Sequence, residues 1–139
     1  MPVKTWIGSE LNPLDGLFTL NEACLSEIGN AVSLIRDNPH PLFMLCPSNF
    51  HMPKCKELIN TVFDCLENGF GFCLLDRLPL EDMTDNEAKS IYWLLSQMLG
   101  RPVAQKWCDG RMLYSVTDLG RPSGNGVRPD VTNEEQSFH

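Results

Sequence analysis

The fold of this chain is decided by a short apolar stretch near its middle, Gly69-Phe70-Gly71-Phe72-Cys73-Leu74-Leu75. A run of this length that is rich in aromatic and aliphatic residues, with glycine at its start and Asp76 after it, is typical of a buried β-strand. Pro79 ends the extended segment, because proline has no amide hydrogen to donate to a neighbouring strand. We therefore predict a strand over residues 70–75.

A helix is predicted after this strand, over residues 84–99. Thr84 and Glu87 have the spacing of a capping box, in which each side chain accepts a hydrogen bond from the other residue's backbone amide. Gly100 ends the helix and Pro102 prevents its continuation. The side chains expected on its buried face are Ala88, Ile91, Leu94, Leu95, Met98 and Leu99.

Another helix is predicted before the strand, from Pro53 to about Asn68, because proline is well suited to a first helical turn. Gly69 provides its C-terminal stop. The apolar residues at helical spacing, which we expect to be buried, are Leu58, Ile59, Val62, Phe63 and Leu66.

The N-terminal part of the chain predicts one further helix. Thr19 and Glu22 form a second capping-box pattern, and Asn38-Pro39 ends the helix, because a residue before proline avoids helical geometry. Its expected buried face consists of Leu25, Ile28, Val32 and Ile35. The segment 39–47 that follows is a connector rich in proline, with a short apolar strand possible at 42–45.

Beyond the last predicted helix, residues 111–116 alternate enough to predict a second strand, so that helices and strands together indicate an α+β fold. Residues 118–136 are rich in glycine, proline and polar residues and predict a long irregular loop. Loops of this length are typically binding loops, lids or flexible segments, and a binding loop and a flexible tail both remain open.

Composition limits the classes of function. The 139 residues suffice for one domain, with 42% hydrophobic and 21% charged residues. A formal net charge of −7 and the absence of a long basic cluster argue against a nucleic-acid partner. No apolar stretch is long enough to cross a bilayer, and the first residues lack the apolar core of a signal peptide, so we expect a cytoplasmic protein without a membrane partner.

The six cysteines, at positions 24, 46, 55, 65, 73 and 108, predict reduced thiols in the core rather than three disulfides, because the chain does not look secreted. A zinc site is not favoured. His51 and Cys55 have helical spacing, but Pro53 lies between them.

Several of these pieces occur in an order that is similar to a known family. Asn68-Gly69-Phe70-Gly71-Phe72 is followed by Leu78-Pro79, by Leu99-Gly100-Arg101-Pro102, by the polar loop, and by Ser137-Phe138-His139. This arrangement resembles the taurine catabolism dioxygenase (TauD/TfdA-like) family of iron(II)- and 2-oxoglutarate-dependent oxygenases. The resemblance covers mainly residues 54–139. It implies an N-terminal helical extension with a connector over 1–52, and over 53–139 the first helices and strands of a double-stranded β-helix, or jelly roll, truncated in this chain.

The resemblance also implies a metal site. In this family a His-x-Asp pair and a distant histidine hold iron, and the position that matches the first histidine is His139. Two imidazoles and one carboxylate leave three positions on a ferrous ion for 2-oxoglutarate and oxygen. The remaining ligands and the 2-oxoglutarate-binding residues do not occur in these 139 residues. We therefore expect the chain alone to bind neither Fe(II) nor 2-oxoglutarate and to be inactive.

Two functional hypotheses follow. In the first, the chain is the N-terminal part of an oxygenase that hydroxylates, desaturates or cyclises a small organic molecule. In the second, it is a non-enzymatic small α/β binding or interaction protein derived from a truncated oxygenase gene, and His139 is a solvated residue without a role. His40 and His51 are expected at the surface or at a helix start, and the acidic residues near Glu87 are expected to stabilise a helix N-terminus rather than act as acid catalysts.

Overall fold

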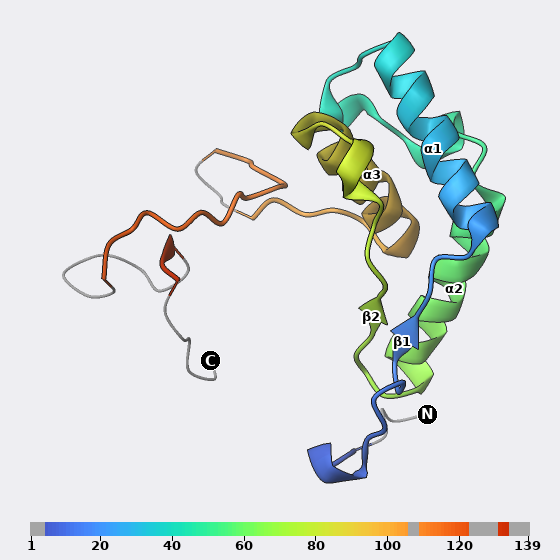
Figure 1. Ribbon diagram of the computed structural model, residues 1–139, viewed down its shortest axis with the longest axis vertical. Helices are drawn as coiled ribbons and strands as arrows, with labels where there is room; N and C mark the ends of the chain where they lie inside the picture. Colours follow the sequence, from blue (N-terminus) through green and yellow to red (C-terminus); the bar gives the residue numbers. More distant parts are fainter. Residues whose placement is uncertain (1–4, 106–108, 123–130, 134–139) are drawn as a thin grey trace. The chain divides into compact units, whose positions relative to one another are not determined.

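The computed structural model describes residues 5–105, 109–122 and 131–133, and it divides the chain into two compact units, residues 1–101 and 102–139. The described part of the first unit contains the helices α1 (Glu22–Asp37), α2 (Pro53–Asn68) and α3 (Asp85–Leu99) and the short strands β1 (Leu17–Phe18) and β2 (Leu74–Leu75) (Figure 1). Each unit is described by itself.

Helix α1 begins later than the sequence predicted. Asn21 is the N-cap, and its side chain accepts a hydrogen bond of 2.9 Å from the backbone amide of Cys24. The predicted capping box of Thr19 and Glu22 is therefore wrong. Leu20 is buried directly before the cap, and Asn21 itself is extended, with φ −74° and ψ 168°, so the helix starts at Glu22. Helix α1 ends at Asp37, before Pro39, as predicted.

Helix α2 has the predicted bounds. Pro53 occupies its first turn, and Gly69 follows its last residue, where a Cβ atom would lie 2.7 Å from the carbonyl oxygen of Cys65. Of the predicted buried stripe, Ile59 and Val62 are buried, whereas Phe63 is half exposed. Cys55, which was not included in that stripe, is fully buried.

Helix α3 confirms the predicted capping box of Thr84 and Glu87. Its buried face includes Ile91, Leu94 and Leu95 as predicted. Trp93 is also buried, and its indole Nε1 is satisfied there by a hydrogen bond of 3.2 Å that it donates to the carbonyl oxygen of Leu45. The neighbouring connector is thereby attached to the helix.

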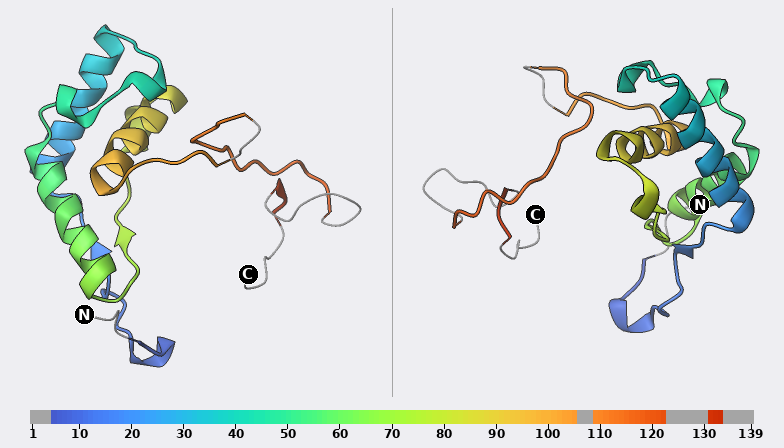
Figure 2. Two further views of the ribbon diagram at one scale, coloured as in Figure 1. Left: turned by 180° about the vertical axis from the view of Figure 1, so that it is seen from behind. Right: turned by 45° about the horizontal axis from the view of Figure 1, so that its top comes forward.

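The three helices pack against one another around one core (Figure 2). Ile28 from α1, Cys55 from α2, and Ile91 and Leu94 from α3 are completely removed from solvent. Close packing of this kind stabilises a small unit chiefly through buried apolar surface. Residues from both predicted regions, 1–52 and 53–139, contribute to this core. The boundary between an N-terminal extension and an oxygenase domain after Met52 stays a prediction.

The two strands form a two-stranded parallel sheet, in which Leu17 pairs with Leu74 and Phe18 with Leu75. The backbone amide of Leu74 donates to the carbonyl oxygen of Gly16 at 2.7 Å. The predicted strand over 70–75 is thus correct only for its last two residues. Residues before it form a turn, with Gly71 at a φ of 76°, a backbone conformation that glycine adopts readily.

Two further strand predictions are wrong. Residues Leu42–Met44 form a 3-10 helix rather than a strand, because prolines at 41 and 47 bracket a segment too short to pair. Residues 111–116, in the second unit, are irregular. Among the described residues the fold is rich in helix, and the predicted jelly roll stays a prediction.

The five described cysteines are free thiols, as predicted. Cys24 and Cys55 lie in the core, but Cys46 is exposed, and Cys108 lies outside the described residues. None of the described helices combines the length and the apolar character needed to cross a membrane.

Candidate functional site

The predicted iron ligand, His139, lies outside the described residues, so its surroundings are not part of the structure. Within the described ranges, no group of three or more His, Cys, Asp or Glu side chains is arranged to hold a metal ion. The described residues by themselves therefore do not fit an iron site.

The other two histidines lie at the surface, as expected. His40 is exposed in the connector after α1, where its Nε2 atom lies 3.2 Å from Nδ2 of Asn38. His51 is exposed two residues before α2. It lines a cavity of about 440 Å³ together with Lys56 and Gln97. Among the described residues, neither histidine belongs to a group of three or more His, Cys, Asp or Glu side chains that could hold a metal ion.

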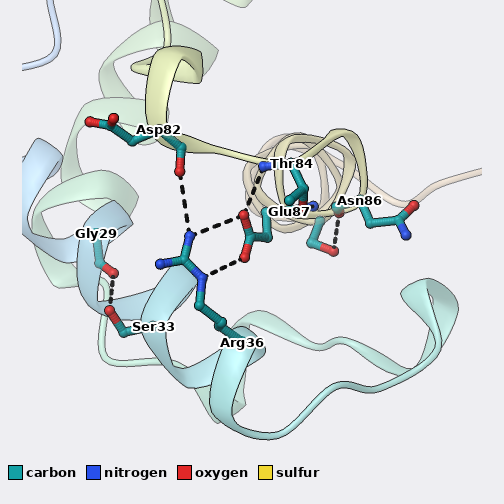
Figure 3. Close-up of polar contacts among 8 residues, drawn as sticks. Gly29, Ser33, Arg36, Asp82, Thr84, Asn86 and Glu87 are labelled. Carbon is teal, nitrogen blue, oxygen red and sulfur yellow. Dashed lines mark hydrogen bonds and ion pairs between the residues drawn. The ribbon is translucent and has the colours of Figure 1, made fainter.

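The best-defined polar cluster of the described chain joins the end of α1 to the start of α3 (Figure 3). Arg36 donates from Nε to Oε1 of Glu87 at 2.8 Å and from a terminal nitrogen to Oε2 at 3.2 Å. The same terminal nitrogen lies 3.4 Å from the carbonyl oxygen of Asp82. A two-point contact between guanidinium and carboxylate fixes orientation as well as distance.

Glu87 is central to this cluster, because it also closes the capping box of α3. Its Oε2 accepts from the backbone amide of Thr84 at 2.8 Å, and its own amide donates to Thr84 Oγ1 at 3.3 Å (Figure 3). The hydrogen bond from Arg36, followed by that from the Thr84 amide, lowers the pKa of Glu87 to about 2. Glu87 is therefore ionised at neutral pH and is not a proton donor, in agreement with the predicted capping role.

A cavity of about 450 Å³ lies beside this cluster within the first unit. It is lined by Ile35, Arg36, Pro39, His40, Pro41, Leu42, Thr84, Asn86, Glu87, Lys89 and Ser90. Ser90, which lines this cavity, donates from Oγ to the carbonyl oxygen of Asn86 at 2.7 Å. The Ser90 hydroxyl is thus bound to a backbone oxygen rather than to a base that could activate it as a nucleophile.

Glu27 makes a second long-range contact that the sequence did not reveal. Its carboxylate, on α1, accepts from the backbone amides of Lys54 and Cys55 at 2.9 Å each. These amides belong to the first turn of α2, which has no side-chain cap of its own. Partial burial opposes ionisation of Glu27, but the two backbone hydrogen bonds outweigh it and lower the pKa. Helix α2 is thus capped by a residue of another helix.

In the second unit, the contacts of the described residues include an ion pair and a backbone hydrogen bond. Arg111 Nε pairs with Asp109 Oδ2 at 2.9 Å, and the amide of Leu119 donates to the carbonyl oxygen of Val131 at 2.9 Å. The second contact closes part of the predicted loop over 118–136.

Comparison with known proteins gives one distant relationship. No family model matches the chain. The chain is 27% identical over 124 residues to FR-33289 synthase of Streptomyces rubellomurinus, and the aligned region covers 88% of this chain. It covers 36% of the length of that synthase.

Proposed function

We propose that this chain is the N-terminal part of an iron(II)- and 2-oxoglutarate-dependent oxygenase of the TauD/TfdA-like kind. The observation that carries the proposal is the ordered series of motifs from Asn68 to His139, which resembles that family. The distant similarity to FR-33289 synthase over most of the chain supports a relationship to an enzyme. Since the chain spans only 36% of that protein, the complete activity is a matter of proposal.

In this proposal the first unit is a support for the catalytic domain. The helices α1, α2 and α3 provide a packed base, and β2 provides an extended segment beside it. His139 would be the first iron ligand, in a set of two histidines and one carboxylate that suits ferrous iron. The described residues offer no such set, so we assign no reaction step to them.

The proposed substrate of the complete enzyme is a small organic molecule, which would be hydroxylated, desaturated or cyclised in the cytoplasm. Iron(II) and 2-oxoglutarate would be its cofactors. The 139-residue chain itself would be inactive, because one imidazole is too few ligands for stable iron binding.

The decisive experiment is to sequence the native transcript through and beyond the codon for His139 and to measure the intact mass of the native protein. The proposal expects an aspartate two residues after His139 and a histidine well downstream. The longer product should then release succinate from 2-oxoglutarate only with Fe(II), and a His139→Ala variant should lose this activity. A His40→Ala variant is the matched control. A stop codon directly after His139, together with an agreeing mass, would contradict the proposal.

A second candidate is a small α/β binding module without iron, and it is favoured by the separate core of the first unit. A cooperative thermal transition with a monomeric sedimentation profile of the 139-residue chain would support it. Aggregation and strong binding of a hydrophobic dye would instead support an oxygenase that lacks its main sheet, because unpaired strand edges would then be exposed.

A further inference from the structure

Two cysteines meet where α2 ends and β2 begins. Cys65 lies in the last turn of α2, and Cys73 directly precedes β2. The Sγ atom of Cys65 lies 3.6 Å from the carbonyl oxygen of Phe72. That oxygen belongs to the peptide group that joins Phe72 to Cys73. The thiol of Cys65 therefore contacts the peptide group that contains the backbone nitrogen of Cys73.

The chain between the two cysteines is held in a tight reversal. The amides of Gly69 and Gly71 both donate to the carbonyl oxygen of Cys65, at 3.0 and 3.3 Å. Gly71 has a φ of 76°, which allows the chain to turn back. Burial, and next the neighbouring Cys65, raises the pKa of the Cys73 thiol. The reversal thus places the Cys65 thiol against the peptide group that leads into Cys73.

Cys65 and Cys73 are more accessible to solvent than the neighbouring cysteines Cys24 and Cys55 of the core. Cys65 and Cys73 are half-buried, so a small oxidant can reach them. Cys24 and Cys55 also approach each other, since Cys55 Sγ lies 3.6 Å from the carbonyl oxygen of Cys24, but both are completely buried. Burial, and next the proximity of Cys24, raises the pKa of Cys55 to about 12. The buried pair is therefore protected, and it provides an internal control.

We propose that Cys65 and Cys73 form a redox-sensitive pair, which closes to an intrachain disulfide when the protein meets a peroxide. One thiol takes an oxygen atom from hydrogen peroxide, becomes a sulfenic acid and releases one water molecule. The second thiol attacks the sulfur atom of the sulfenic acid, the S–S bond forms, and a second water molecule leaves. Two thiols are oxidised and one peroxide is reduced, so that atoms and electrons balance.

The bridge would fasten the entry of β2 to the end of α2. A disulfide requires Cα atoms about 4.4–6.8 Å apart, so the proposal requires the reversal between α2 and β2 to bring Cys65 and Cys73 within this separation. Oxidation should then raise the thermal midpoint of the first unit, because the cross-link reduces the freedom of the unfolded chain.

The test uses the full chain, treated with hydrogen peroxide under native conditions, alkylated and digested with trypsin. Cleavage after Lys56 and Arg77 yields one peptide, residues 57–77, which contains Cys65 and Cys73 and no other cysteine. The expected result is that this peptide loses two hydrogen atoms and takes up no alkyl group. The peptides with Cys24 and Cys55 should remain alkylated.

Variants separate the pair from unspecific oxidation. Cys65→Ser and Cys73→Ser should each abolish the mass loss of the 57–77 peptide and the rise of the thermal midpoint. Cys46→Ser, which removes an exposed thiol elsewhere, should retain both effects. The proposal is overturned if the wild-type peptide keeps two alkylated thiols after oxidation, or if Cys65 or Cys73 is found bridged to Cys46 or Cys108 instead.

Discussion

The two units of this chain differ in how their polar and apolar groups are used. In the first unit, residues far apart in sequence share a core. Glu27, on α1, accepts a hydrogen bond from a backbone amide at the start of α2, and Glu87 accepts one at the start of its own helix, α3. In the described part of the second unit, the contacts include short-range turns, an exposed ion pair between Arg111 and Asp109, and a backbone hydrogen bond between Leu119 and Val131. Any cooperative unfolding of this chain is therefore expected to come from the core of the first unit.

The largest expected effect concerns the core. Leu94→Ala should lower the free energy of unfolding by about 2–5 kcal/mol, because Leu94 is completely buried and the substitution leaves a cavity. Val116→Ala in the second unit, where the side chain is 70% exposed, should change it by less than about 0.5 kcal/mol. Urea unfolding followed by circular dichroism measures both. Equal effects at the two positions would remove the contrast between the units.

A smaller effect is expected from the ion pairs, and it depends on pH. The folded-state pKa of Glu87 is about 2, below the ordinary value of 4.5, so its stabilisation is fully present above the ordinary value and is lost as the pH falls toward 2. Glu87→Gln should lower the free energy of unfolding at neutral pH. In this variant, the free energy of unfolding should also fall less between pH 4.5 and about 2.

The matched control for Glu87 is Asp109→Asn, which removes the ion pair with Arg111 in the second unit. The Arg111 side chain is 63% exposed, and ion pairs in solvent contribute little. Thermal midpoints from pH 7 downward measure both variants. If Asp109→Asn changes the acid-induced decline as much as Glu87→Gln does, the ion pair at α3 has no special role.

The smallest effect concerns the start of α1. Asn21→Ala should cost about 1 kcal/mol, because the amide of Cys24 loses its hydrogen-bond acceptor. Thr19→Ala should be nearly neutral, although the sequence pattern favoured Thr19 as the cap. In the second unit, Asp118→Ala removes a similar bond, from the amide of Gly120 to Oδ1 at 2.8 Å, and should also be nearly neutral. A larger loss at Thr19 than at Asn21 would contradict the observed helix start.

These contrasts also explain what could be predicted from the sequence. The bounds of α2 and the cap of α3 depend on residues within one helical turn, so that Pro53, Gly69 and the pair Thr84 and Glu87 were sufficient. The start of α1 was misplaced because Thr19 and Asn21 are both residue types that cap helices well, and only the structure shows that Asn21 accepts the hydrogen bond from the Cys24 amide.

The polar cluster around Arg36 and Glu87 could not be predicted from the sequence in this way. The contact between Arg36 and Glu87 spans 51 residues, and no local pattern indicates it. Strand predictions failed for a related reason, because a strand forms only where a partner is available, and β2 pairs over just two residues with a segment that carries no strand pattern. The role of His139 stays a prediction, since it comes from the resemblance alone.

The hydrogen bonds from the start of α2 to Glu27 limit the positions at which the protein can be shortened or recombined. A protein engineer who shortens the coding sequence to begin at Pro53, or who exchanges the first 52 codons for those of a relative, removes the acceptor for two amides at the head of α2. Chimeras that keep an acidic residue at position 27 should express as folded protein more often than those that do not. Viable recombination points are therefore to be sought after Arg101, where the first compact unit is complete.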